Sequence, residues 1–200
     1  MPAGLSWPSL PLDRGLAFFS SYQRREARKG ERYQATLHAL RQVAEDAVKI
    51  LEEDLAELPP HFFKARWVVL HVASELEHPT ALSLFRSAIW DDPAPVTIER
   101  GNSHDENSPL VMEDTTRLAA IRGIEGLAGM SSTGALDMLL EIAKAHPSYA
   151  IRSQAALAYL AKSPDEAAAR RHLRAVLRPG DEDILAIQRV SEAPKVASHP

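Results

Sequence analysis

The sequence predicts an all-α protein built from stacked pairs of helices, and two observations carry this prediction. First, three segments begin alike: Arg66, Arg117 and Arg152 each follow a small or apolar residue and precede a run of small and apolar residues at helical spacing. Second, only 6% of the residues are aromatic while alanine is abundant, which favours closely packed helices over a β-sandwich. One helix pair cannot bury its apolar face alone, so repeated pairs imply a continuous core and an extended surface.

The first 30 residues are predicted to form an arm and a short helix. Residues 1–11 contain three prolines, and a short helix is expected from Asp13 with apolar side chains on one side. Residues 22–33 then carry five basic side chains against two acidic ones. We interpret this excess as a solvated helix face or linker, with a patch for an acidic partner as the alternative.

A long N-terminal helix is predicted over residues 31–58, where Pro59 and Pro60 end it. Its apolar residues recur at steps of three or four: Tyr33, Leu37, Leu40, Ala44, Ala47, Leu51, Leu55 and Leu58. Such a helix would be about 40 Å long, which leaves open a bend or a division within it. The stripe either covers the stack or pairs with a second copy, so the chain is predicted to be a monomer or a homodimer through residues 33–58.

Three helix pairs are expected to follow: 62–76 with 79–90, 114–128 with 133–145, and 148–161 with 164–178. Ser163 is predicted to cap the last of these helices, with Pro164 at its first position and Glu166 completing a capping box. A short final helix from Asp181 shields the end of the stack. The predicted domain therefore covers residues 31–192, and residues 193–200 form a frayed tail.

An acidic insertion interrupts the pairs over residues 91–112. The stretch from Asp91 to Asp114 carries seven acidic residues against one basic residue, a net charge of −6 in a chain whose total is −4. A loop of this length inside a compact domain is usually functional or disordered.

These residues resemble the HEAT-repeat and armadillo superfamily, particularly short bacterial HEAT-like proteins. The segment from Ile151 to Ala158 fits the first-helix pattern of an apolar residue, arginine and spaced alanines, and the segments at Arg66 and Arg117 fit it more loosely. Arg117 and Arg152 are 35 residues apart, a typical repeat length, while the 51 residues from Arg66 to Arg117 require the insertion. The resemblance implies a HEAT-like α-solenoid of antiparallel helix pairs. It also implies structural arginines that bridge to a neighbouring acid or cap helix carbonyls, and a concave binding face lined by the second helices.

Catalytic and metal signatures are absent from the sequence. The chain has no cysteine, no Gly-x-Ser-x-Gly and no His-Glu-x-x-His. The compact group His104-Asp105-Glu106 is interpreted as a solvated loop, with weak binding of a hard cation as the alternative. We therefore predict no catalytic residues, no metal and no cofactor.

Charge and hydropathy argue against two classes of partner, nucleic acids and membranes. A net charge of −4 argues against a nucleic-acid groove, and no apolar run is long enough to span a membrane. With no secretory signal recognised at the N-terminus, a cytoplasmic location is the default expectation.

The sequence thus favours a non-enzymatic protein-binding module: an adaptor, a scaffold or an inhibitor of the immunity-protein type whose acidic loop faces a basic partner. The predicted contact residues are Arg86, Trp90, Asp105, Glu106, Asp137, Glu141, Arg171 and Arg174. The resemblance also leaves an alternative, an enzyme or cofactor-handling protein like the bilin lyases or DNA glycosylases, with Trp90, Asp91, Asp92 and Glu141 around its pocket.

Overall fold

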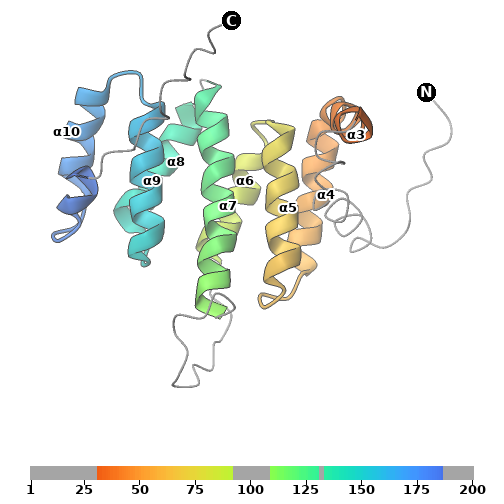
Figure 1. Cartoon of the computed structure of the whole chain (residues 1–200), viewed down its shortest axis with the longest axis horizontal. Helices are drawn as coiled ribbons and strands as arrows, with labels where there is room; N and C mark the ends of the chain where they lie inside the picture. Colours follow the sequence, from red (N-terminus) through yellow and green to blue (C-terminus); the bar gives the residue numbers. More distant parts are fainter. Residues whose placement is uncertain (1–30, 92–108, 131–132, 187–200) are drawn as a thin grey trace, which may run out of the picture.

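The computed structural model describes residues 31–91, 109–130 and 133–186, and every regular element in these ranges is helical. Figure 1 shows the helices side by side in chain order. They are α3 (Glu31–Arg41), α4 (Ala44–Glu57), α5 (Phe63–Leu76), α6 (Ala81–Trp90), α7 (Pro109–Gly129), α8 (Thr133–Ala145), α9 (Tyr149–Lys162), α10 (Glu166–Val176) and the 3-10 helix η1 (Glu182–Ala186). The predicted all-α class is confirmed for this part of the chain. None of these helices combines the length and the apolarity that a membrane crossing requires.

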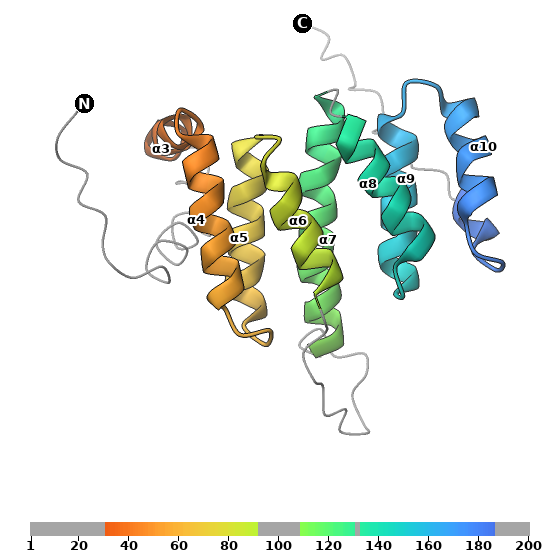
Figure 2. The same ribbon diagram turned by 180° about the vertical axis from the view of Figure 1, so that it is seen from behind.

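The chain alternates between two rows of helices. One row contains α5, α7 and α9, which pack against one another in that order. The other row contains α4, α6, α8 and α10, and it faces the viewer in Figure 2. We call this second set the α4–α10 row.

A single apolar core runs between the rows. It includes Leu70 on α5, Phe85 on α6, Ile124 on α7, Leu139 on α8 and Ile151 on α9, all of them fully buried and in one cluster. The helices of the α4–α10 row are amphipathic and leave one face in solvent, whereas α9 is buried around most of its circumference. The core therefore extends along the stack and does not gather at one centre.

The predicted long helix over residues 31–58 is not continuous: the chain divides it into α3 and α4 at Gln42 and Val43, the division that its length had left open. α4 and its neighbour α5 both have 14 residues, so an undivided helix would extend past the end of α5 into solvent. After the break, α3 instead packs on α5, and Leu37 is buried there. Arg41 holds the corner, since its guanidinium binds the carbonyl of Glu75 and the carboxylate of Glu77.

Two helix boundaries also differ from the prediction. α7 begins at Pro109, so residues 109–112 belong to a helix and not to the insertion; proline fits a first turn because its missing N–H has no partner there anyway. The N-cap of α10 is Asp165, whose carboxylate accepts from the amide of Ala168, and Ser163 instead ends α9. Aspartate caps as well as serine does, and Ser163 already donates to the carbonyl of Tyr159.

Several predictions fall outside the described residues. They are the arm and short helix of residues 1–30, the insertion from residue 92 to residue 108, the end of the final helix beyond Ala186, and the tail of residues 193–200.

Candidate functional site: a groove between α4 and α6

The three repeated arginines are buried and tie successive helices together. Arg66 on α5 donates to the carbonyls of Leu55 and Leu58 at the end of α4, and its Nη2 lies 2.7 Å from Oδ2 of Asp91, the residue that ends α6. Each arginine with its partners is one stage of the stack, and Arg152 on α9, two stages after Arg66, makes the same kinds of contact. It donates to the carbonyls that follow α8, at His146 and Pro147, and binds Asp181 through two bonds of 2.7 and 3.0 Å. The predicted structural role of these arginines is confirmed.

The middle arginine has a different set of partners. Arg117 on α7 caps α6 through the carbonyl of Asp91 and pairs with Glu113, four residues earlier on its own helix, at 3.0 Å. In the other two stages an aspartate follows the second helix: Asp91 after α6 and Asp181 after α10. After α8 the corresponding residue is His146. The Nε of Arg117 is buried without a hydrogen-bond partner. The middle stage is therefore the least well compensated of the three.

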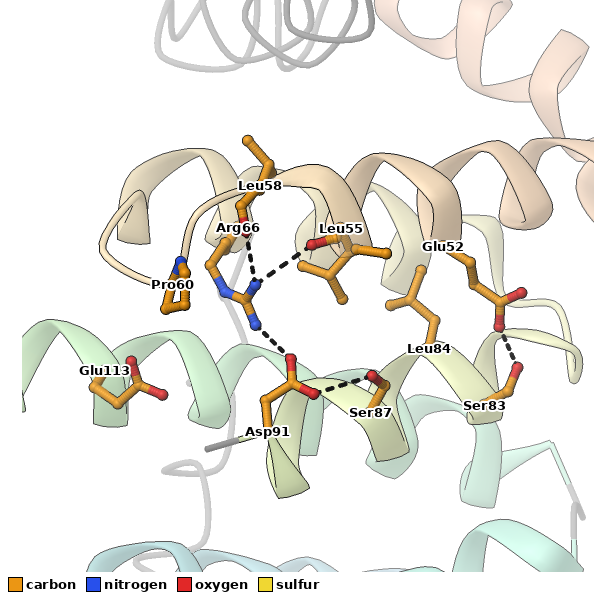
Figure 3. Close-up of a pocket in the computed structure, with 11 residues that line it drawn as sticks. Glu52, Leu55, Leu58, Pro60, Arg66, Ser83, Leu84, Ser87, Asp91 and Glu113 are labelled. Carbon is orange, nitrogen blue, oxygen red and sulfur yellow. Dashed lines mark hydrogen bonds and ion pairs between the residues drawn. The ribbon is translucent and has the colours of Figure 1, made fainter. Parts of the chain in front are cut away.

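A groove of about 650 Å³ lies between α4 and α6, beside Arg66. Figure 3 shows leucines in its middle and polar groups toward its two ends. Its apolar lining consists of the buried Leu55 and Leu84, the half-buried Leu58 and the exposed Ala56 and Pro60. Three carboxylates, Glu52, Asp91 and Glu113, line it together with Arg66, Ser83 and Ser87.

Hydrogen bonds join α4 or α5 to α6 at both ends of the groove. At one end the hydroxyl of Ser83 donates to the carboxylate of Glu52. At the other end Asp91 accepts from Arg66 and, at 3.2 Å, from the hydroxyl of Ser87. These contacts link α6 to α4 and to α5 on either side of the leucines, of which Leu55 and Leu84 are buried.

The electrostatics of the groove are acidic. α4 carries six acidic residues against Lys49 alone, a net charge of −5 on one 14-residue helix. Burial raises the pKa of Glu113 above its ordinary value of 4.5, and the nearby Arg117 and Arg66 offset this only in part. A carboxylate kept in such surroundings costs stability at neutral pH, which is common at binding and catalytic sites.

The predicted contact residues are spread along the α4–α10 row. Arg86 on α6 and Glu141 on α8 form a two-bond ion pair of 2.8 and 2.7 Å, which is the one contact that the structure shows between members of the predicted set among the described residues. Trp90 is 36% exposed and packs its ring 5.5 Å from that of His146. The remaining described members, Asp137, Arg171 and Arg174, are exposed on α8 and α10. Asp105 and Glu106 lie outside the described residues.

The alternative pocket around Trp90, Asp91, Asp92 and Glu141 does not come together among its described members. Asp91 lines the groove and is bound by Arg66, whereas Glu141 is engaged by Arg86 and does not line it. Asp92 lies outside the described residues. Within the ranges that the structure describes, no three histidine, aspartate or glutamate side chains are grouped as a metal site requires.

Most groove residues were not predicted as a site. One signal was present in the sequence: Ser83, Ser87 and Asp91 follow one another at four-residue steps, which places a polar stripe along one face of α6. Glu52 gave no such signal, because an acidic residue beside an apolar stripe is ordinary on a surface helix. Glu113 was assigned to the edge of the insertion, and its burial follows only from the longer α7.

No protein-family model, no curated protein and no solved structure that was compared with the chain matches it significantly.

Proposed function

We propose that the chain is a HEAT-like α-solenoid of antiparallel helix pairs that acts as a non-enzymatic protein-binding module. The arginines support the repeat: each lies in the first helix of a pair, donates to carbonyls at the end of the preceding second helix, and pairs with a carboxylate. Stacked repeats of this kind offer extended surfaces suited to partner binding.

The groove between α4 and α6 is the observation that carries the proposal. It opens in the row of second helices, the row to which the resemblance assigns partner binding, and it combines apolar surface with carboxylates. Protein interfaces have such an apolar centre with a polar rim. The predicted contacts Arg86, Trp90, Asp137, Arg171 and Arg174 are exposed on helices of the same row. In this proposal the module works in the cytoplasm as an adaptor, a scaffold or an inhibitor.

Site-specific crosslinking in the host cell tests the proposal. A photoreactive amino acid at Asp137 on α8 is expected to capture one protein in stoichiometric yield, identified by mass spectrometry. The matched control carries the same group at Gln154, which is exposed on α9 in the other row. Equal capture at both positions, or capture at neither, would contradict a partner face on the α4–α10 row.

A further inference from the structure

We propose that the groove between α4 and α6 binds a basic amphipathic segment of the partner protein, seating arginine or lysine side chains between the two helices. This inference rests on the proposed function and adds to it the chemistry of the partner and the place where the partner docks.

Charge complementarity favours a cationic guest. Glu52, Asp91 and Glu113 line the groove against Arg66 alone, and the helix on one side of it has a net charge of −5. Each carboxylate has lone pairs to spare beyond its present partner, since it accepts up to about four hydrogen bonds. A basic segment therefore gains charge-assisted hydrogen bonds without breaking the hydrogen bonds that join the helices.

The apolar part of the groove wall favours a cation on an aliphatic stem over a small ion. Leu58 and Pro60 line the groove beside Arg66 in Figure 3, and Leu58 is half-buried while Pro60 is exposed. A bound side chain would lay its methylene groups on them and reach a carboxylate with its head. Arginine and lysine bury their stems in this way. A groove of about 650 Å³ is the size of a ligand pocket and takes a few side chains, not a whole domain.

Glu113 adds an independent argument from burial. Its side chain is 12% exposed, and the charged groups that act on it are Arg117, Arg66, Asp114 and Asp91. The two arginines do not fully offset the cost of burying its charge, as its raised pKa indicates. A guest cation at this end of the groove supplies the missing compensation.

Fluorescence anisotropy with two labelled twelve-residue peptides tests the inference. One peptide alternates leucine and arginine, and the other replaces each arginine with citrulline, which keeps the shape and removes the charge. The full chain is expected to bind the arginine peptide at least tenfold more tightly. Glu52→Gln, which keeps an acceptor for Ser83, should weaken binding about fivefold, and Glu113→Gln should act alike. The matched control is Glu53→Gln, an exposed neighbour on α4 outside the groove, with less than a twofold effect.

Two results would overturn the inference. Equal binding of the citrulline peptide would show that charge is not recognised, and equal losses in Glu52→Gln and Glu53→Gln would show a diffuse field without a groove site. The crosslinking at Asp137 separates this failure from that of the proposed function. If the captured partner binds Glu52→Gln as tightly as it binds the unchanged chain, the module stands and the groove is not its docking site.

Discussion

We predict that alanine at Gly123 and alanine at Gly126, both in α7, change the stability of the chain differently. A Cβ added at Gly123 would lie 2.3 Å from Cζ of Phe85 and 2.6 Å from two other atoms of that ring, which is fully buried in α6. Carbon atoms pack at about 3.5–4.0 Å, so α6 and α7 would have to separate by about 1 Å. A Cβ added at Gly126 meets nothing within 4 Å.

Alanine at either position gains about 1 kcal/mol of helix propensity over glycine. Because both glycines lie in one helix, this gain cancels when the two variants are compared. The difference isolates the overpacking at Phe85, about 1–3 kcal/mol. We expect Gly126→Ala to stabilise the chain by about 1 kcal/mol and Gly123→Ala to fall below it by the overpacking cost.

Urea unfolding followed by circular dichroism at matched slopes measures both free energies. The reasoning fails if Gly123→Ala is as stable as Gly126→Ala, because α6 would then not approach α7 at this point.

Two further predictions concern the buried charges. Asp181→Asn leaves the charge of Arg152 without its partner in a pair whose side chains are only 7% (Asp181) and 8% (Arg152) exposed, so it should lower the free energy of unfolding by about 3 kcal/mol. The control Glu166→Gln breaks the exposed pair with Arg170 and should cost less than about 1 kcal/mol in the same urea assay. Burial and the nearby Arg117 lower the pKa of His146 in the folded chain below 6.5. As the pH falls, His146 is therefore protonated in the unfolded chain before it is protonated in the folded chain. The free energy of unfolding should fall as the pH drops below 6.5. His146→Gln should remove this part of the pH dependence, and an unchanged slope between pH 7.5 and pH 5.5 would contradict the assignment.

The helical class was predictable because it depends on local patterns. An arginine followed by spaced apolar residues indicates a helix with a buried face at Arg66, Arg117 and Arg152. This indication does not depend on the length or position of the neighbouring helix. The length of residues 31–58 left a division open, but its position at Val43 was not predictable from a local pattern. Residues 37–58 keep one apolar stripe, and the break arises from the length of α5, which is a property of another element.

The groove depends on the lateral spacing of α4 and α6, which no local pattern encodes. Glu52 and Ser83 are 31 residues apart in the chain, and their hydrogen bond forms only when the two helices lie in one row. Arg66 was assigned a structural role, and the structure confirms that role while also placing Arg66 in the wall of the groove.

The three arginine stages explain why the groove lies at the first of them. Asp181, the carboxylate of the last stage, is 7% exposed and enclosed by Arg152. In the middle stage the end of α8 carries His146, which is neutral at pH 7, buried, and in ring contact with Trp90. Asp91 is 41% exposed while its Arg66 is 8% exposed, so one side of this pair holds the fold and the other faces the groove. At the first stage the acid is therefore accessible from the groove, and the proposed cation site uses the same pair that joins α5 to α6.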